Sequence, residues 1–487
     1  MNDIIHTLEV INLPTDELVI KNVSRNPDGS VVVTVEKKRI GMYCENCGCR
    51  MHSKGIYHHI VNHPVLNGHY AGTLILDVVQ RKWRCPDCGT YSTDEFTFLE
   101  KRKQSTTILP LMILNEMKDL NVTCRQVAER LHISDTHVHT TFLRYVDMKP
   151  LPLSRIISID EVHMNFNNRD RYAMIIMDFI TNEIIEILPN RGREVTDAFF
   201  RSIPQSEKDK VEYIVSDMYK PYINYAGTTF KHARPVVDSF HVISWLLNKI
   251  NLYINDVKKR YQARDRKSLE EKNYRTNRDY KTIKESDEVI LLKKHRWIIL
   301  KKQDDIHYSG QYRHVKGLRG IYLTTDQLEK KFLDLDPHFR EIRELKEKYF
   351  AFNSIHVNDF EGAEHYLDDL INMYRACSIA LFREFAELLS TYRKEIISSF
   401  KYISAESIKT EADSIENFRR LSNGPIEGFN NKPKDLKRIS NGVSNFEFVR
   451  NRILWATRKD AVMLGVPKTD KEVHTYTGKV RGPYKKK

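Results

Sequence analysis

No stretch of this 487-residue sequence approaches the roughly 18 consecutive apolar residues that a membrane-spanning helix needs. The first residues are acidic and lack the basic and then apolar pattern of a secretion signal. With 41% hydrophobic and 29% charged residues, the composition is neither that of a disordered tail nor that of a collagen-like or coiled-coil fibre. We therefore expect a globular, cytoplasmic protein of several domains, with no membrane partner.

Cysteine is scarce, with seven residues in the chain, and the odd number argues against a disulfide framework. Four of the seven belong to two Cys-x-x-Cys-Gly turns. Each turn points two thiolates at one ion, so the pair predicts a structural zinc (Zn²⁺) site with four sulfur ligands. The predicted ligands are Cys44, Cys47, Cys85 and Cys88, and the residues that could replace one of them are Cys49, His52 and His63.

Acidic residues are outnumbered by basic ones. The chain has 78 Lys and Arg against 65 Asp and Glu, so its formal charge is 78 − 65 = +13. Such a surplus favours a polyanionic partner such as nucleic acid, although it says nothing about the fold. The surplus is concentrated in residues 258–302 and 479–487, which makes these two segments candidate surfaces for a DNA backbone.

The N-terminal region, residues 1–104, is expected to be rich in β-strand. Residues 18–23 and 31–35 flank a turn signal at residues 26–29, and a β-like run at residues 73–83 leads directly into the second cysteine turn. This pattern predicts a sheet that carries a zinc ribbon.

Residues 105–149 change to helical spacing. Thr123 and Gln126 have the form of a capping box, the following apolar residues space as a buried face, and Ser134 can cap a second helix. This pattern predicts a helix-turn-helix whose second helix could enter a DNA major groove, although such helix pairs also occur in plain bundles. The residues expected to contact DNA are Ser134, His137, Thr140, Thr141 and Arg144.

After a proline-containing linker, residues 153–240 read as a mixed α/β sheet. Strands are expected at residues 156–159, 172–179, 184–188, 213–216 and 235–237, with a helix at 194–200. Three strands of antiparallel type, a helix and two further strands are compatible with a ribonuclease-H-like core.

Asp160 and Asp217 follow two of these strands, where both side chains could reach one pair of ions. Two-metal phosphodiester chemistry needs converging carboxylates, and hard oxygen ligands suit magnesium (Mg²⁺). The third carboxylate is usually supplied by a helix, and Glu427 lies in the first turn of one that opens near Asn423. The candidate ligands are Asp160, Asp217 and Glu427, and the competing acids are Glu161, Asp178 and Asp238.

If the helix that carries Glu427 continues, the same face presents Lys434 and Arg438, with Lys437 nearby, to a phosphate backbone. Pro433 should kink or break that helix. Glu427 lies far along the chain from Asp217, so something is inserted between the two parts of the core.

The inserted residues, 241–415, read as an all-helical domain because long amphipathic stretches dominate them. Residues 416–465 are assigned to the second part of the catalytic core and residues 466–487 to a basic tail. Within the insertion, Trp245 and Trp297 could stack on an unpaired base or belong to the core.

In their order along the chain, these segments resemble the bacterial insertion-sequence transposases of the DDE type that form the ISL-three class. The likeness rests on the two cysteine turns and on Ile157-Ser158-Ile159-Asp160-Glu161, Val215-Ser216-Asp217-Met218, Val237-Asp238-Ser239-Phe240-His241-Val242 and Asn423-Gly424-Pro425-Ile426-Glu427-Gly428. The resemblance implies that Asp160, Asp217 and Glu427 are the catalytic triad and that magnesium or manganese (Mn²⁺) is the cofactor. Residues 90–96 depart from the family's usual ending of the ribbon.

We therefore predict a multidomain α/β transposase that acts on double-stranded DNA, both transposon ends and target, in the bacterial cytoplasm beside the nucleoid. The helix-turn-helix and zinc ribbon would bind the terminal inverted repeats, and a homodimer would pair two ends. A DNA-binding regulator derived from a transposase would need none of the acids. A ribonuclease-H-like nuclease or resolvase would cut without strand transfer.

Overall fold

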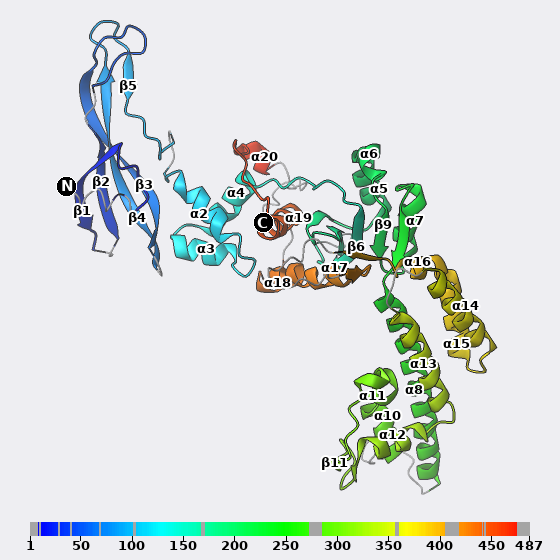
Figure 1. Cartoon of the computed structure of the whole chain (residues 1–487). Helices are drawn as coiled ribbons and strands as arrows, with labels where there is room; N and C mark the ends of the chain where they lie inside the picture. Colours follow the sequence, from blue (N-terminus) through cyan, green and yellow to red (C-terminus); the bar gives the residue numbers. More distant parts are fainter. Residues whose placement is uncertain are drawn as a thin grey trace, which may run out of the picture. The chain divides into compact units, whose positions relative to one another are not determined.

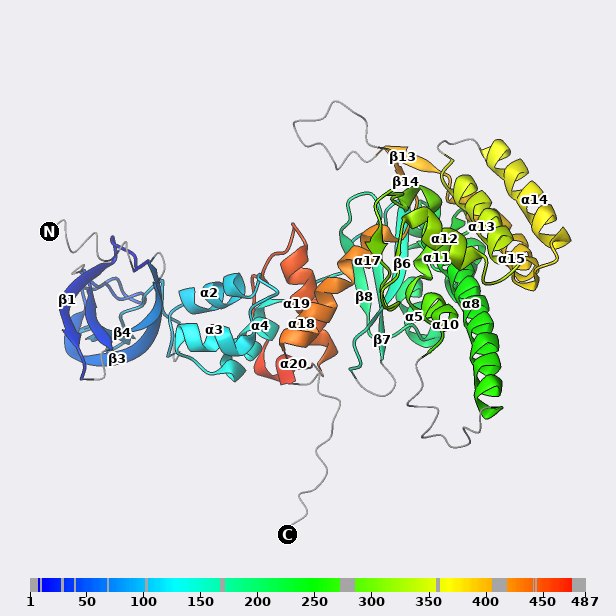
Figure 2. The same cartoon turned by 90° about the horizontal axis from the view of Figure 1, so that it is seen from below.

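The computed structural model of the chain divides into two compact units (Figures 1 and 2). Unit 1 comprises Met1–Pro150, His163–Tyr172 and Asn430–Lys487, and unit 2 comprises Leu151–Val162 and Ala173–Phe429. The structure describes residues 8, 11–27, 30–38, 41–67, 70–100, 104–166, 171–271, 285–355, 360–404, 418–440, 442 and 445–474. No helix in these described ranges is long and apolar enough to cross a membrane. The basic segment 479–487, and residues 272–284 of the other basic segment, lie outside them.

A five-stranded sheet forms the N-terminal part of unit 1. Its strands are β1 (Leu18–Arg25), β2 (Val31–Lys37), β3 (His52–Asn67), β4 (Tyr70–Arg84) and β5 (Tyr91–Thr93). Their order is β1-β2-β4-β3, with β5 paired to β4. Alternate residues of β2 and β4, including Val35, Leu76 and Val78, are fully buried on one face. The strands expected at 18–23, 31–35 and 73–83 are all present.

The helix-turn-helix follows as α2 (Ile108–Glu116), α3 (Cys124–Leu131) and α4 (Asp135–Tyr145). The capping box is present: the Gln126 N–H donates to the Thr123 hydroxyl at 3.2 Å, and the Thr123 N–H donates to the Gln126 side chain at 2.8 Å. His132 then turns the chain with a left-handed conformation, and Ser134 caps α4. Local side-chain capping therefore sets both helix starts.

Helices from the C-terminal part of the chain complete unit 1. They are α18 (Asn431–Ile439), α19 (Phe446–Thr457) and α20 (Asp470–His474). The buried Arg452 of α19 donates to the carbonyl oxygens of Asp119 at 2.6 Å and Val122 at 2.9 Å, just before α3. The Trp455 indole N–H donates to the Leu114 carbonyl of α2 at 2.9 Å. These hydrogen bonds therefore connect α19 to the helix-turn-helix.

Unit 2 contains a mixed sheet in the order β10-β9-β6-β7-β8. The strands are β6 (Ile156–His163), β7 (Tyr172–Asp178), β8 (Ile184–Leu188), β9 (Tyr213–Ser216) and β10 (Arg234–Val237). β9 lies parallel to both β6 and β10, and β7 and β8 form an antiparallel hairpin. The connecting helices are α5 (Arg193–Ser202), α6 (Gln205–Lys208) and α7 (Lys220–Thr228). Every strand predicted for residues 153–240 is present.

A mostly helical region with its own buried core follows β10. Its helices are α8 (Ser239–Glu270), α10 (Asp287–Lys294), α11 (Trp297–Leu300), the 3₁₀-helix η1 (Gln303–Asp305), α12 (Thr325–Leu333), α13 (Phe339–Asn353), α14 (Phe360–Ala376), α15 (Ala380–Thr391) and α16 (Arg393–Ser398). In both views α13 runs beside the long α8 (Figures 1 and 2). Trp245 and Trp297 pack, half-buried, against this core.

The prediction that this region is entirely helical is wrong. β11 (Arg313–His314) and β12 (Tyr322–Leu323) form a short antiparallel pair between η1 and α12. A second antiparallel pair, β13 (Tyr402–Ser404) and β14 (Phe418–Arg420), follows α16. Strands of two or three residues carry too little periodic signal to be recognised from sequence.

The helix that carries Glu427 is short. It is α17 (Gly424–Phe429), and α18 begins anew at Asn431. Pro433 was expected to break a continuous helix, but the break comes earlier, and Pro433 lies in the first turn of α18, where its missing N–H has no intrahelical partner to lose. Glu427 therefore belongs to unit 2, whereas α18 and its cations belong to unit 1.

Candidate active site

Three carboxylates occupy matching positions on neighbouring parallel strands of unit 2. The registers align Ser158 of β6, Val215 of β9 and Val236 of β10. Two residues further along the chain stand Asp160, Asp217 and Asp238. Asp160 lies within β6, which continues to His163, whereas Asp217 and Asp238 directly follow β9 and β10. Because neighbouring strands lie about 4.8 Å apart, the three carboxylates form a row at the carboxyl edge of the sheet.

The row lies on one particular face of the sheet. Ile157 and Ile159 pack into the core beneath α5 and α7. Ile156 instead packs with Val215 and Leu421 on the other face. Side chains alternate along a strand, so Asp160 shares a face with Ile156, and Asp217 shares it with Val215. Leu421 leads into α17, which carries the third predicted ligand.

α17 brings Glu427 to this edge. The Glu427 Oε1 atom lies 3.5 Å from the Nε2 atom of His241, which is in the first turn of α8. Asp238 is the N-cap of α8, and its ligand atom lies within 4.8 Å of those of His241 and Glu427. Two carboxylates and an imidazole are a donor set that can hold a divalent cation.

Burial makes these carboxylates costly to ionise without a cation. The Asp238 side chain is 2% exposed and accepts the backbone N–H of Phe240 at 3.4 Å. Burial raises the pKa of Asp238 and also the pKa of Asp217. Asn423, immediately before α17, is fully buried, and its side-chain nitrogen and oxygen have no hydrogen-bond partner among the described residues. A cation could coordinate the amide oxygen, whereas the amide nitrogen needs an acceptor such as solvent.

The other competing acids are engaged elsewhere. Glu161 accepts two bonds from Arg191, at 2.8 and 2.9 Å, and one from the Tyr222 hydroxyl at 2.8 Å, on the α7 face. Asp178 caps the turn after β7 by accepting the Ile180 N–H at 2.8 Å. β7 runs antiparallel to β6, so Asp178 lies at the opposite end of the sheet from Asp160. Of the three competitors, only Asp238 stands in the row.

Comparison with known proteins matches this part of the chain to one family. Residues 157–453 match the family described as Transposase, of the DDE type and the ISL-three class. The chain belongs to this transposase family. It is also similar to the transposase for insertion sequence element IS1001 of Bordetella parapertussis, with 22% identity over 421 residues, 84% of this chain and 86% of that protein. The resemblance predicted from the sequence motifs is therefore confirmed.

His241 belongs to the candidate site by its position, and it was not among the residues predicted from the sequence, although it lies in a quoted motif. The available signal was the segment Asp238-Ser239-Phe240-His241, which follows a strand and opens a helix. That spacing puts a carboxylate at the helix cap and an imidazole in the first turn. The structure adds that α17 lies beside the start of α8, which brings Glu427 close to both side chains.

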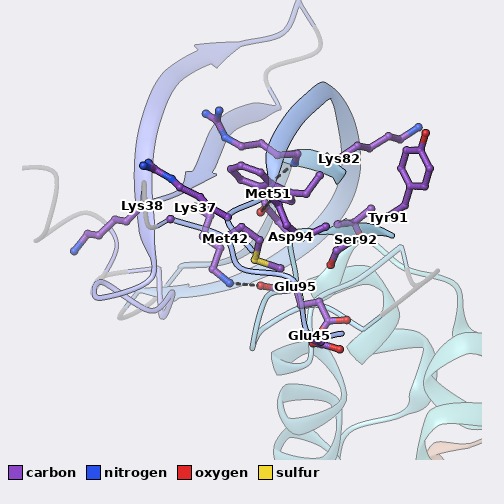
Figure 3. A pocket seen from close by; sticks show the side chains of 15 residues that line it. Lys37, Lys38, Met42, Glu45, Met51, Lys82, Tyr91, Ser92, Asp94 and Glu95 are labelled. Atoms are coloured by element: carbon purple, nitrogen blue, oxygen red, sulfur yellow. Dashed lines mark hydrogen bonds between the residues drawn. The ribbon is translucent and has the colours of Figure 1, made fainter. Parts of the chain in front are cut away.

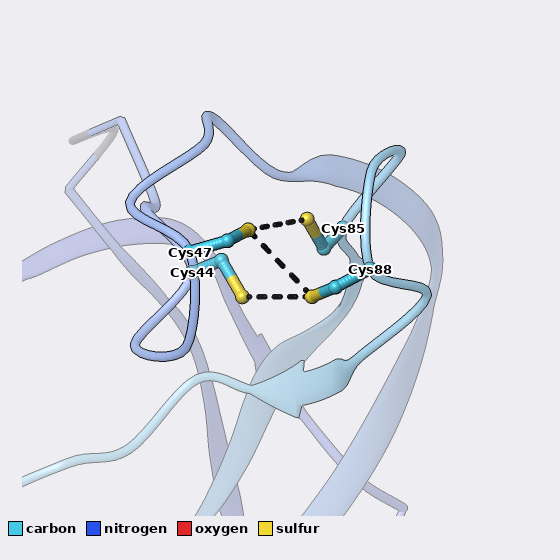
Figure 4. A group of neighbouring side chains, drawn as sticks. All are labelled: Cys44, Cys47, Cys85 and Cys88. Atoms are coloured by element: carbon cyan, nitrogen blue, oxygen red, sulfur yellow. Dashed lines mark hydrogen bonds between the residues drawn. The ribbon is translucent and has the colours of Figure 1, made fainter.

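In unit 1 of the transposase, the four cysteines of the two turns converge (Figure 4). The Sγ atoms of Cys44 and Cys88 are 3.4 Å apart, those of Cys47 and Cys85 are 3.4 Å apart, and those of Cys47 and Cys88 are 3.6 Å apart. Zinc–sulfur bonds of about 2.3 Å give tetrahedral edges of about 3.8 Å, so the four thiols fit one zinc ion. Hydrogen bonds from Thr90 lower the pKa of Cys88 to about 6, which favours the thiolate.

The alternative zinc ligands differ in their environments. His63 is fully buried between the Thr106 hydroxyl, 3.0 Å from Nδ1, and the Ile11 carbonyl, 2.5 Å from Nε2. Burial lowers the pKa of His63. His52 joins no cluster of metal-binding side chains within the described part of the chain, whereas Cys49 lies close to Cys47. Cys49 is therefore the alternative that geometry leaves open.

A pocket of about 1020 Å³ opens beside the zinc turns (Figure 3). Its cations are Lys37, Lys38, Arg50, Arg81 and Lys82, and its aromatic side chains are Trp83 and Tyr91. Asp94 accepts the Trp83 indole N–H at 2.7 Å, so the wall formed by this ring is fixed in place. Cations beside flat aromatic faces are a combination that binds nucleic acid.

The predicted DNA-contacting residues of α4 do not all face outward. His137 is exposed and Thr140 is half-buried. Thr141 is 4% exposed, because it shares a helix face with Val138 and Phe142 at steps of three and four residues. Thr141 was predicted to contact DNA, and its burial disfavours such a contact.

The two ends of α4 carry further interactions. Ser134 is exposed and accepts the His137 N–H at 3.1 Å, so its hydroxyl caps the helix. Arg144, in the last turn, forms an ion pair with Asp470 of α20. On α18, Lys434 and Arg438 are exposed and Lys437 is half-buried. These cations share unit 1 with the helix-turn-helix.

Proposed function

We propose that the protein is a DNA transposase that binds the terminal inverted repeats of an insertion sequence and catalyses metal-dependent strand cleavage and strand transfer. The observation that carries the proposal is the row of Asp160, Asp217 and Asp238, with Glu427 beside it on α17. Membership of a transposase family supports the same reaction class.

The strand order supports a ribonuclease-H-like catalytic core. β6 is central, with the parallel strands β9 and β10 on one side and the antiparallel hairpin β7–β8 on the other. In this arrangement the carboxyl ends of three parallel strands meet at one edge. Asp217 and Asp238 follow two of those ends, and Asp160 lies within the third strand.

When bound, magnesium or manganese polarises the scissile phosphate and activates the attacking oxygen. Asp160, Asp217 and Glu427 would hold such ions, with Asp238 next to them. His241 lies 3.5 Å from Glu427 and would help to orient its carboxylate. The short α17 and the first turn of α8 position these two side chains from opposite ends of the helical region.

DNA recognition is proposed for unit 1. His137 and Thr140 of α4, together with Ser134 at its cap, would read or position the terminal repeat, and Lys434, Lys437 and Arg438 would contact its backbone. The pocket beside the zinc turns would add backbone and base contacts, and a structural zinc ion held by the four cysteines would fix that wall. A homodimer would hold two ends together.

The decisive experiment incubates the protein with Mg²⁺, a labelled duplex of the DNA end that flanks its gene, and a supercoiled plasmid. Ends joined to plasmid DNA are the expected product. Cut ends without joining would indicate a nuclease or resolvase. Binding without either product would indicate a regulator derived from a transposase.

A further inference from the structure

A second basic groove lies in unit 2, between α5 and α7. It has a volume of about 770 Å³. Five cations and a single carboxylate line it: Arg191, Arg193, Arg201, Lys208, Lys231 and Asp197. Neutral polar side chains such as Asn224 and Thr228 form much of the remaining wall. None of these residues was singled out from the sequence.

Three of the five cations carry uncompensated charge. Arg191 is neutralised by Glu161, and Arg193 pairs with Asp197 at 3.2 Å. Arg201, Lys208 and Lys231 form no ion pair with any described residue. Arg201 and Lys208 donate instead to the backbone carbonyls of residues 197 and 200, at 3.1 and 3.2 Å. Uncompensated cations in a concave surface attract a polyanion.

One end of the groove reaches the loop that follows Asp217, although the groove lies on the face of the sheet opposite to the carboxylate row. Tyr219 lines it and donates its backbone N–H to the Asp217 carboxylate at 3.1 Å. The Tyr219 ring lies 5.0 Å from the Arg191 guanidinium, which fixes this end of the groove. From there the wall follows α7 to Lys231. A DNA strand that rounds this edge of the sheet from the carboxylate row would meet these cations.

We propose that this groove binds the phosphate backbone of target DNA during strand transfer, an inference that rests on the proposed function. Lysine, arginine and neutral polar donors contact phosphates without reading sequence. Recognition of the transposon end needs sequence readout and is assigned to α4 in unit 1. Target DNA needs contacts to its backbone alone, because it is not selected by the same sequence readout. The target duplex is therefore the DNA that this groove would hold.

The test compares two triple variants of the full chain. One is Arg201→Gln, Lys208→Gln and Lys231→Gln, and the other is the control Lys330→Gln, Lys331→Gln and Lys394→Gln. The control removes the same charge from exposed positions of α12 and α16 in the same unit. Binding to a duplex of random sequence is measured across salt concentrations. For this binding measurement each triple variant also carries Glu427→Gln, so that the DNA is not cut. Joining of a pre-cleaved end to a plasmid and cleavage of a flanked end are measured with the active site intact.

Loss of three phosphate contacts should lower the slope of log affinity against log salt by about 2 to 3 relative to the control. Joining should fall about 10-fold while cleavage of the flanked end stays unchanged. A salt slope equal to that of the control would overturn the groove as a DNA surface. Loss of flanked-end cleavage with normal joining would overturn its assignment to target DNA. If the otherwise wild-type protein neither cleaves nor joins, the proposed function fails, whereas the binding measurement still decides the groove.

Discussion

The Nε2 atom of His241 lies 3.5 Å from the Oε1 atom of Glu427. This contact joins the first turn of α8, where the helical region begins, to α17, where unit 2 ends. Asp238 caps the same helix and completes the group. The long helical region between them therefore leaves and returns at one point, beside the strand-end acids.

His241 should matter for metal-dependent cleavage. Replacing His241 with Ala removes the imidazole that orients Glu427, so we expect cleavage to fall about 10- to 100-fold and to need more Mg²⁺ for half-maximal rate. His365→Ala, at an exposed position of α14, is the matched control. The measurement is a Mg²⁺ titration of end cleavage, and a wild-type titration curve for His241→Ala would contradict the assignment.

The proposed zinc site predicts which cysteine variants keep the metal. Cys47 is one of the four converging thiols, so we expect the wild-type chain to bind zinc and Cys47→Ser to lose it, with a less stable N-terminal sheet. Cys49→Ser is the control and should keep the metal. Elemental analysis of the purified proteins decides the matter. If Cys47→Ser retained zinc and Cys49→Ser lost it, the ligand would be Cys49 and not Cys47.

His63 should make the N-terminal sheet sensitive to acid. Burial lowers its folded-state pKa, so the unfolded chain, with a histidine pKa of about 6.5, binds the proton more readily. The stability that neutral His63 contributes is fully present above the unfolded-state pKa. It is lost as the pH falls through the lowered pKa of the folded state.

Hydrogen exchange of β3 amides, compared between pH 7.5 and pH 5, tests this prediction. His63→Gln should show weaker acid sensitivity than the wild type. His52→Gln, at an exposed position of the same strand, should behave like the wild type. Equal acid sensitivity in His63→Gln and wild type would show that another group is responsible.

Arg452 should hold the helix-turn-helix together. Its side chain is 1% exposed and donates to two backbone carbonyls before α3. Arg452→Ala leaves those carbonyls unpaired, so we expect a loss of about 2 to 4 kcal/mol in the stability of unit 1 and weaker end binding. Lys459→Ala, nearby and exposed, should be neutral. Denaturant unfolding with a DNA-binding assay measures both effects, and a stable Arg452→Ala variant would refute the role.

Local patterns predicted much of the fold, because capping and periodicity are properties of neighbouring residues. The capping box at Thr123 and the strand that precedes Asp217 were predicted in this way. The strand expected to end before Asp160 is also present, but it continues past Asp160 to His163. The register between strands and the return of α17 to the start of α8 depend on residues far apart in the chain. The sequence alone therefore could not place Asp238 in the row of carboxylates or His241 beside Glu427. The hydrogen bonds of Arg452 to the helix-turn-helix were missed for the same reason.

The central claim is that Asp160, Asp217 and Glu427 carry the chemistry. The most direct measurement is Mg²⁺-dependent cleavage of a labelled end duplex by Asp160→Asn, Asp217→Asn and Glu427→Gln, with end binding followed in parallel. Asp178→Asn, which alters a turn acid at the other end of the sheet, is the control. We predict that each of the three loses at least about 1000-fold in cleavage while binding persists and the control stays active. Full cleavage by any of the three would contradict the account.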